Sequence, residues 1–244
     1  MNNTTKNLLI NKYKEATKVV FFGGAGVSTK SGIPDFRSPT GLYKVKSEYG
    51  VSYETILSHS YYAYNTKIFF DFYKKHMIYK DAKPNKAHKI LTELQKQKDI
   101  TIVTQNIDGL HAMAGNKKVI ELHGSINRNY CEKCHTFFDL DYILESKGVP
   151  KCSHCGGTVK PDVVLYEEGL NERDIYAAIE AIRNADLIIV AGTSLNVYPA
   201  AQFIQYRKQS ATLAIVNLES TPYDMYADIV IHEDIGEVLE SLIK

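Results

Sequence analysis

Short apolar runs rich in β-branched residues recur along the chain, and each ends in residues that favour turns. Runs of this length without polar alternation are typical of strands buried on both faces of a parallel sheet. Two segments between them carry apolar residues at helical spacing. The predicted strands are residues 19–22, 100–104, 187–191, 213–216 and 229–231, and the predicted helices are 86–97 and 174–184. Strands alternating with helices predict a Rossmann-like α/β fold, a parallel sheet with helices on both faces.

Two segments interrupt this alternation. Residues 44–80 are rich in aromatic side chains and are interpreted as a helical insertion that covers a cleft, with the aromatics used for packing. Residues 128–159 hold all four cysteines and predict a small inserted ribbon. The strand-like run 163–165 is then expected to resume the main fold. The main domain would comprise residues 1–43, 81–127 and 160–244.

The first predicted strand runs into a glycine-rich segment, Gly23-Gly24-Ala25-Gly26-Val27-Ser28-Thr29. A strand followed by such a loop indicates a phosphate-binding turn, because glycines let backbone N–H groups approach an anion. The G-x-G-x-x-G motif of dinucleotide-binding folds needs a third glycine, but Thr29 stands at that place. The acidic ribose ligand usual about 20 residues later is also missing. We expect a dinucleotide here, held differently from that of a dehydrogenase.

Small or amide-bearing polar residues follow four of the predicted strands. In open parallel sheets, ligands bind at the carboxyl ends of the strands. The four segments are Gly24-Ala25-Gly26, Gln105-Asn106-Ile107-Asp108, Gly192-Thr193-Ser194 and Asn217-Leu218-Glu219. Polar loop tips could explain any one of them but explain all four poorly, so we expect a ligand site at this edge.

The cysteines form two pairs, Cys131-x-x-Cys134 and Cys152-x-x-Cys155. This spacing matches a tetrahedral zinc site with four thiolate ligands. Two disulfides, which a cytosolic protein disfavours, and a redox dithiol are the alternatives. A complete set of four thiolates predicts a closed, structural site, with the adjacent His135 and His154 as bystanders.

His123 lies in Glu121-Leu122-His123-Gly124, just before the cysteine-bearing insertion. A cleft is expected between the nucleotide domain and an inserted module. A neutral imidazole, with a pKa of about 6.5, is a suitable base for a ribose hydroxyl. His123 is therefore the candidate catalytic base, and Gly124 is expected to permit close approach of a ligand.

Composition narrows the classes of function. The 244 residues suit one large α/β domain with a small appendage. The 29 Lys and Arg residues nearly balance the 28 Asp and Glu residues, so no nucleic-acid partner is expected. No apolar run reaches the roughly 20 residues of a membrane span, and the polar amino terminus lacks a signal-peptide core. We expect a cytoplasmic protein without a membrane partner.

These motifs together resemble those of the sirtuins. The resemblance runs from about residue 15 to the end, with the motifs in order and at family-like spacing. The segments that carry it are Gly24-Ala25-Gly26-Val27-Ser28, Ser31-Gly32-Ile33-Pro34-Asp35-Phe36-Arg37, Thr104-Gln105-Asn106-Ile107-Asp108-Gly109-Leu110-His111, Leu122-His123-Gly124, both cysteine pairs and Gly192-Thr193-Ser194-Leu195.

The resemblance implies an NAD-dependent protein-lysine deacetylase. NAD would be consumed as a co-substrate, a structural Zn²⁺ would be bound, and the products would be nicotinamide, O-acetyl-ADP-ribose and free lysine. His123 would be the general base. The implied cofactor-binding residues are Ala25, Thr29, Asp35, Phe36, Arg37, Gln105, Asn106, Ile107, Asp108, His123, Gly192, Thr193, Ser194, Asn217, Asp234 and Ile235. In this scheme Asn106 and Asp108 hold the ribose and the carboxamide, and Asp234 and Ile235 lie near the adenine.

The resemblance also implies that an acyl-lysine peptide binds as an added strand between two loops, at Val164, Tyr166 and Asn196. The chain departs from the family where Glu167 replaces a usual glycine and Ser38 replaces another. Relatives that prefer acidic acyl groups carry a tyrosine with an arginine three residues later. Tyr73 is followed here by His76, so we expect acetyl groups to be preferred over succinyl groups.

Two alternatives stay open. The same site could perform mono-ADP-ribosylation or NAD hydrolysis, since both begin with loss of nicotinamide. A binding module that uses its zinc ribbon for a partner, with NAD as a sensor ligand, is a third possibility that the neutral charge and His123 disfavour. The sequence predicts neither protein targets nor an oligomeric state.

Overall fold

The computed structural model describes residues 3–36 and 48–243. A six-stranded sheet forms its centre, in the order β3-β2-β1-β7-β8-β9, and every neighbouring pair is parallel. The strands are β1 (Lys18–Gly23), β2 (Asp99–Thr104), β3 (Val119–Glu121), β7 (Leu187–Ala191), β8 (Thr212–Val216) and β9 (Ile229–Ile231). The predicted strands are therefore confirmed, and β3 is added at one edge.

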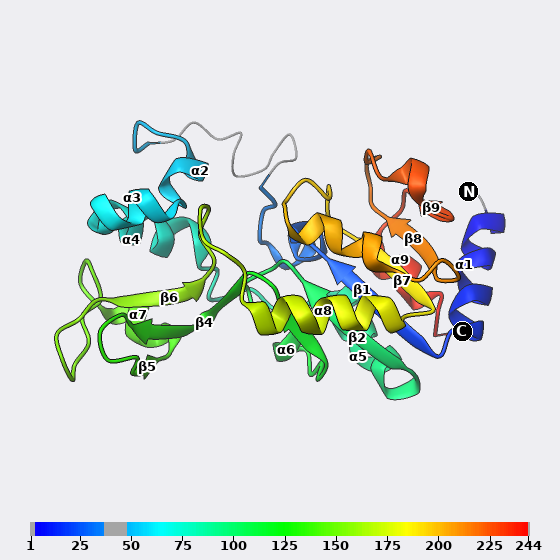
Figure 1. Ribbon diagram of the computed structural model, residues 1–244, viewed down its shortest axis with the longest axis horizontal. Helices are drawn as coiled ribbons and strands as arrows, with labels where there is room; N and C mark the ends of the chain where they lie inside the picture. Colours follow the sequence, from blue (N-terminus) through cyan, green and yellow to red (C-terminus); the bar gives the residue numbers. More distant parts are fainter. Residues whose placement is uncertain (1–2, 37–47, 244) are drawn as a thin grey trace.

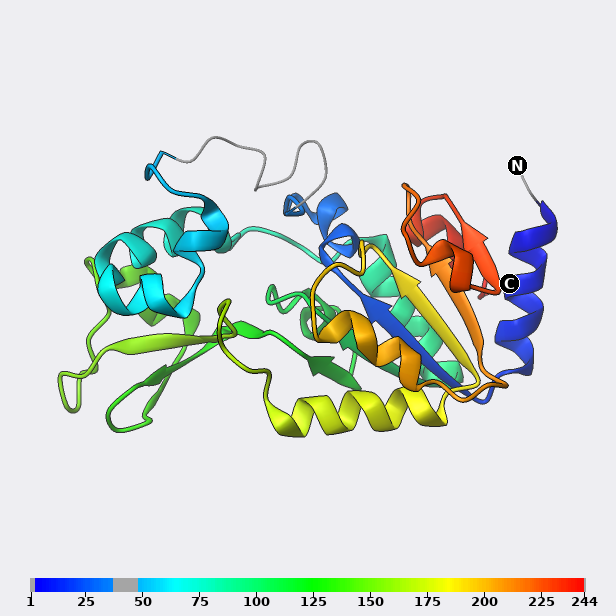
Figure 2. The same cartoon turned by 45° about the horizontal axis from the view of Figure 1, so that its top comes forward.

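Side chains of β1 alternate between two hydrophobic cores, as a strand covered on both faces requires. Val19 and Phe21 enter a core with α1 (Asn3–Glu15), α5 (Lys86–Gln97) and α9 (Ile235–Glu240). Val20 and Phe22 enter the opposite core with α8 (Glu172–Asn184) and η5 (Ala200–Tyr206). Figures 1 and 2 show these helices on the two sides of the sheet. The Rossmann-like prediction is confirmed.

Two of the long helices, α5 and α8, begin at side-chain caps that are visible in the sequence. Asn85 caps α5, where it accepts from the N–H of Ala87, and the ring of His88 accepts from the Asn85 N–H. Asn171 caps α8 in the same way. Such caps satisfy N–H groups that a helix leaves free at its start.

A second, smaller body stands beside the large sheet (Figure 2). Its antiparallel sheet has the order β5-β4-β6, from β4 (Gly124–Cys131), β5 (Phe137–Phe138) and β6 (Val159–Val163). The helix α7 (Leu140–Glu145) lies between β5 and β6 in the chain. Three short helices and a π-helical turn cover it, namely α2 (Tyr53–Ile56), α3 (His59–Tyr64), α4 (Thr66–Phe72) and η4 (Tyr73–Met77). Phe69, Phe70, Phe72 and Tyr73 are fully buried in the core that joins them. The interpretation of the aromatics as packing residues is confirmed for these four, but not for Tyr64, which is 88% exposed.

The expectation that residues 163–165 resume the main sheet is wrong. β6 ends at Val163 and pairs antiparallel with β4, whereas the large sheet resumes at β7. A β-branched run does not specify its partner strand, and this one is fixed by pairing of Gly124 with Val163. The smaller sheet extends past both limits of the predicted ribbon, and the division of the chain into domains stays a prediction.

The remaining described elements are short. They are η1 (Ala25–Val27), η2 (Thr29–Ser31), α6 (Leu110–Met113) and η6 (Asp224–Tyr226). Among the described residues, no helix is both long and apolar enough to cross a membrane.

Candidate active site

The sheet order reverses between β1 and β7, because the chain adds β2 and β3 on one side of β1 and β8 and β9 on the other. Loops that leave two such strands diverge and open a crevice at their carboxyl ends, the usual ligand site of an open α/β sheet. The glycine-rich segment and Gly192 follow these two strands. The candidate site is therefore expected at this edge of the sheet, where the polar strand ends predict it.

The glycines bring the two loops into direct contact. The Gly26 N–H donates to the Gly192 carbonyl at 2.8 Å, and the Gly24 N–H donates to the Ala191 carbonyl at 3.1 Å. A Cβ on Gly26 would lie 2.8 Å from the Gly192 Cα, and a Cβ on Gly24 would lie 2.6 Å from the Thr193 Cβ. These two glycines are thus required by loop packing, in addition to any approach of an anion.

A cavity of about 240 Å³ opens between this edge of the large sheet and the smaller body. Predicted site residues that line it are Ala25, Phe36, Gln105, Asn106, Ile107, Asp108, His123, Val164 and Tyr166. Lining residues that lie in segments singled out from the sequence, but that were not predicted as site residues, are Ser28, Ile33, Pro34, His76, Val163, Leu165, Glu167, Glu168, Val197 and Tyr198. The lining residues without a signal in the sequence are Leu57, Met77, Tyr79, Ile126, Leu170 and Pro199. Most of these are apolar residues from the smaller body and the loops, where the sequence gives no chemical signal.

His123 lies in the two-residue connection between β3 and β4. Its Nδ1 is 2.9 Å from the Gln105 carbonyl, which can only accept, so Nδ1 carries the proton and Nε2 is left with a lone pair. Burial lowers the pKa of His123, against a smaller opposing effect of the Gln105 carbonyl. The imidazole is accordingly neutral at pH 7 and able to accept a proton at Nε2.

Asn106 and Asp108 are joined through Ser28, a residue that the sequence analysis quoted but did not assign. The Ser28 hydroxyl donates to Asp108 at 2.6 Å and accepts from the Asn106 amide at 3.1 Å. This arrangement fixes the orientation of the amide, because its nitrogen faces Ser28. The available signal for this role was a hydroxyl side chain directly after the glycine-rich turn.

Thr193 and Asn217 form a second group, outside the cavity lining. The Thr193 N–H donates to the Asn217 side-chain oxygen and the Asn217 amide donates to the Thr193 carbonyl, both at 3.1 Å. The Gln105 amide reaches the Thr193 hydroxyl at 3.2 Å. The structure thus connects this group to the pocket through Gln105, and Gly192 and Ser194 flank Thr193.

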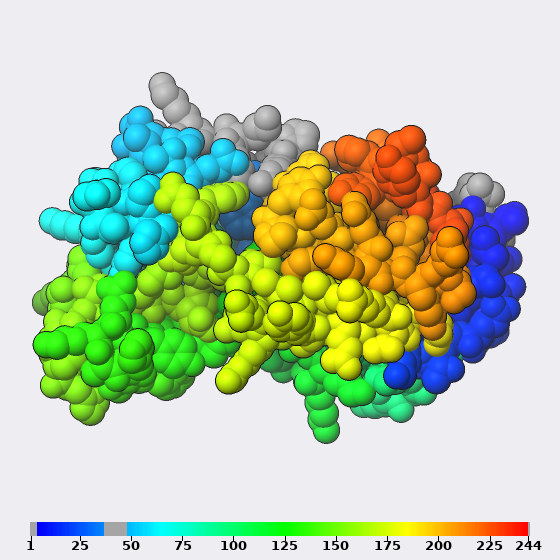
Figure 3. Space-filling view, in the orientation of Figure 1, coloured from blue at the N-terminus to red at the C-terminus, as the bar shows by residue number. Residues whose placement is uncertain are grey.

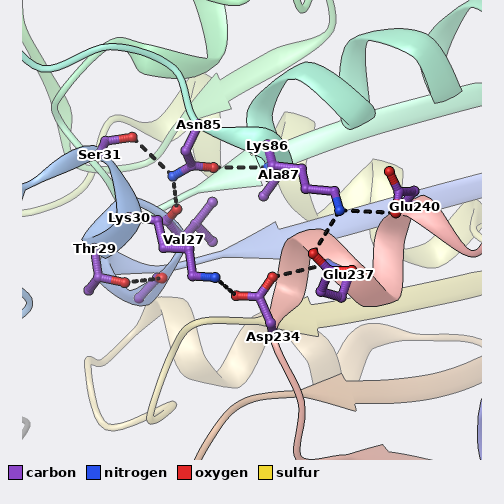
Figure 4. A network of polar contacts seen from close by, with 11 residues as sticks. Val27, Thr29, Lys30, Ser31, Asn85, Lys86, Ala87, Asp234, Glu237 and Glu240 are labelled. Carbon is purple, nitrogen blue, oxygen red and sulfur yellow. Dashed lines mark hydrogen bonds and ion pairs between the residues drawn. The ribbon is translucent and has the colours of Figure 1, made fainter.

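Thr29 lies in the glycine-rich segment, and Asp234 contacts its neighbour Lys30 (Figure 4). Asp234 caps α9 and pairs with Lys30 at 2.9 Å, which brings the start of α9, with Ile235, to this segment. The Thr29 hydroxyl donates to the Gly26 carbonyl at 3.0 Å, so its proton is engaged in the turn. None of these three predicted residues lines the cavity.

Asn85 attaches the helix α5 to the same segment (Figure 4). Its amide donates to the Val27 carbonyl at 2.8 Å and to the Ser31 hydroxyl at 3.0 Å. A cap residue therefore also fixes the turn that carries Lys30.

Other predicted residues have different positions. Asp35 and Asn196 do not line the cavity, while Phe36, next to Asp35, does. Arg37 and Ser38 lie outside the described residues.

Both loops of the peptide prediction contribute to the cavity lining. Val164 and Tyr166 come from one loop, and Val197 and Tyr198 come from the other. The Val164 N–H donates to the His123 carbonyl at 3.0 Å, so this loop is attached to the backbone of the candidate base.

The two residues used to predict acyl preference are separated by the structure. His76 lines the cavity, but Tyr73 is fully buried in the core of the smaller body. Tyr73 cannot contribute half of a carboxylate-binding pair from there. The expected preference for acetyl groups therefore depends on the apolar lining and the absence of an arginine among the described lining residues.

The four cysteines converge at the end of the smaller sheet, with all four sulfur atoms within 4.8 Å of one another. Three Sγ–Sγ distances are 3.3, 3.4 and 3.6 Å. Four thiolates around Zn²⁺ lie about 3.8 Å apart when each Zn–S bond is about 2.3 Å. The cluster fits a structural zinc ion, held by Cys131, Cys134, Cys152 and Cys155.

Comparison with known proteins agrees with this geometry. A family model described as the Sir2 family matches residues 24–199. An NAD-dependent protein deacetylase of Clostridium tetani is 56% identical over 99% of this chain and 98% of its own, and one of Clostridium perfringens is 55% identical over 96% and 98%.

Solved structures match over the same extent. A Sir2 variant with deacetylated p53 peptide and 3'-O-acetyl ADP ribose superposes with a TM-score of 0.88 at 36% identity, covering 97% of this chain and 96% of that one. A Sir2 complex with p53 peptide and NAD⁺ superposes with a TM-score of 0.84 at 35% identity, covering 97% of this chain and 96% of that one.

Proposed function

Because the chain belongs to the Sir2 family, we propose that it removes acetyl groups from protein lysine side chains in a reaction that consumes NAD. The observation that carries this proposal is the position of His123, whose free Nε2 belongs to a ring that lines a cavity. A dinucleotide-type loop and the two loops of residues 164–168 and 197–199 line the same cavity. Relatives 42–56% identical to this chain are named NAD-dependent protein deacetylases.

His123 acts as the general base in this proposal. The acetyl oxygen of the modified lysine displaces nicotinamide at the ribose carbon, and Nε2 takes the proton of a ribose hydroxyl. The acetyl group passes to ADP-ribose and, with uptake of water, lysine leaves as the free amine. The lowered pKa of His123 keeps the base neutral at pH 7.

The remaining residues hold NAD at two places. Asn106 and Asp108, oriented through Ser28, bind the nicotinamide ribose and the carboxamide. Thr193, Ser194 and Asn217 bind the adenosine end, with Asp234 and Ile235 near the adenine. Gln105 links the two places because its backbone orients His123 while its amide contacts Thr193.

Zinc supports the fold of the smaller body and takes no part in the reaction, since four cysteines complete its coordination. Reduced thiolates persist in the cytoplasm, which we propose as the location of the protein. The substrate is an acetyl-lysine peptide, extended between residues 164–168 and 195–198.

The test is turnover of an acetyl-lysine peptide with and without NAD, followed by mass spectrometry. We expect nicotinamide, free lysine peptide and O-acetyl-ADP-ribose in equal amounts. Protein carrying ADP-ribose, or ADP-ribose without peptide turnover, would instead support the ADP-ribosyltransferase or glycohydrolase alternative. A succinyl peptide serves as the matched substrate and should react more slowly.

The residue-level control is His123→Ala. It should lower kcat by at least about 100-fold, the usual contribution of a general base, while zinc content and NAD binding stay near those of the unaltered protein. Retained turnover in this variant would contradict the assignment of the base.

A further inference from the structure

Glu167 has an uncommon backbone conformation, with φ of +75°. In the described part of the chain, only His135 and Leu195 are other non-glycine residues with positive φ. A side chain in this region costs about 1 kcal/mol or more, and such residues occur where surrounding contacts hold them. Something must therefore hold Glu167 in a conformation that glycine adopts freely.

The Glu167 carboxylate is held at the start of helix α3. One oxygen accepts from the Ser60 N–H at 2.9 Å, and the other accepts from the Ser60 hydroxyl at 3.0 Å. The Ser60 N–H lies in the first turn of α3, where backbone N–H groups have no hydrogen-bond partner within the helix. Glutamate supplies two hydrogen bonds at this position that glycine cannot form.

Neighbouring contacts extend the attachment. Tyr166 and Ser58 form a parallel bridge, with hydrogen bonds of 2.9 Å from the Tyr166 N–H to the Leu57 carbonyl and from the His59 N–H to the Tyr166 carbonyl. Glu168 pairs with His59 at 2.9 Å. In the space-filling view, the yellow-green segment after β6 lies directly against the cyan helical segment (Figure 3). Residues 165–168 are thus joined to residues 57–60.

The same residues form one wall of the cavity. Tyr166, Glu167 and Glu168 line it, as do Val197 and Tyr198 of the second loop. The Glu167 carboxylate hydrogen-bonds to Ser60, which is not part of the Asn106–Ser28–Asp108 network.

We propose that Glu167 is a positioning residue for the acyl-lysine substrate: by fixing residues 165–168 to helix α3, it holds the wall against which the peptide adds as a strand. This inference rests on the proposed function. A prepared wall binds peptide without first having to be ordered, so loss of the attachment weakens peptide binding. NAD contacts lie on the large sheet and are unaffected.

The experiment compares Glu167→Ala, Glu167→Gly and Glu167→Gln. The alanine variant loses both hydrogen bonds and keeps the energetic cost of the positive φ. The glycine variant loses the hydrogen bonds but not that cost. The glutamine variant keeps an acceptor for the Ser60 N–H. We expect the KM for an acetyl-lysine peptide to rise about 3- to 10-fold in the alanine and glycine variants, the effect of one or two hydrogen bonds. The glutamine variant should keep the peptide KM close to that of the unaltered protein, while the KM for NAD changes less than about two-fold in all three variants.

The matched control is Glu180→Ala, which removes an exposed glutamate on α8. It should leave both KM values unchanged. A glycine variant with an unaltered peptide KM would overturn the positioning role, even if the alanine variant had lost thermal stability.

The positioning role can be tested separately from the proposed function. If the unaltered protein did not turn over acetyl peptide, binding of that peptide would be measured directly by fluorescence anisotropy in the presence of NAD. Weaker binding to the glycine variant would still support the positioning role, and equal binding would overturn it.

Discussion

Gly124 shows how one residue can connect the packing of two strands to the placement of the candidate base. Its φ is +78°, and a Cβ at this position would overlap the Asp162 carbonyl oxygen of β6. The sequence suggested that this glycine allows a ligand to approach. The structure gives a different reason, the close contact of β4 with β6 directly after His123.

A Gly124→Ala change should therefore destabilise the protein by more than about 3 kcal/mol, since it combines a left-handed alanine with a backbone overlap. Urea unfolding followed by circular dichroism measures this loss. Gly148→Ala is the matched control, because Gly148 also has positive φ, +69°, but faces open space. It should cost only about 1 kcal/mol; equal losses in the two variants would contradict the packing argument.

Helix α5 illustrates an element whose start contacts two neighbouring segments. Asn85 binds the turn that carries Lys30, and His88 packs against His111 of α6 with ring centroids 4.7 Å apart. Both histidines are buried, with exposed fractions of 0% and 2%. Burial lowers the pKa of His88 to about 4, partly opposed by Asp108, and burial and the neighbouring His88 lower that of His111 to about 3.

Acid should therefore destabilise this element before carboxylates lose their charge. In the unfolded chain both histidines titrate near pH 6.5, so from that pH downward the unfolded state binds more protons. The free energy of unfolding should fall by up to about 1.4 kcal/mol per pH unit for each histidine, until the folded-state pKa values are reached. Urea unfolding between pH 7 and pH 4 measures the slope. A His111→Leu variant should show a shallower fall, and an unchanged slope would contradict the assignment.

Elements with a regular pattern were predictable from sequence, and those that depend on a partner were not. The central strands and α5 follow from buried apolar runs and helical spacing. The pairing of β6 with β4 did not follow, because tertiary contact at Gly124 decides it. The same division holds at the site. Gln105, Asn106 and His123 carry recognisable chemistry, whereas Leu57 and Met77 line the cavity only because the smaller body folds over it.

At the scale of the whole molecule, the smaller body has one core shared by two distant parts of the chain. Phe69, Phe70 and Tyr73 pack there with Ile126 and with the zinc-ligating Cys131 and Cys152. Metal binding to four thiolates contributes directly to folding free energy. The zinc site therefore supports the helices of residues 53–77 as well as its own ribbon, and the helical segment contributes Leu57, His76 and Met77 to the cavity lining.

Removing zinc with a chelator should abolish deacetylation and unfold the smaller body, including α2–α4. Tryptic cleavage within residues 53–77, followed by mass spectrometry, would locate the change, and metal content would be measured in the same samples. Restored turnover after addition of Zn²⁺ is the control. Full activity in protein shown to be free of zinc would contradict this dependence.

The position of His123 between β3 and β4 has a consequence for exchanging parts between relatives. Leu122 hydrogen-bonds to Thr104 of the large sheet, and the His123 carbonyl accepts from Val164, which follows the small sheet. A chimera joined at residue 122 or residue 165 would place residues from different relatives in direct contact with His123. Junctions inside β4 and β6, beyond Gly124 and Asp162, keep the native contact behind His123, so a transplanted zinc-binding segment could alter substrate range while leaving the proton acceptor where it is.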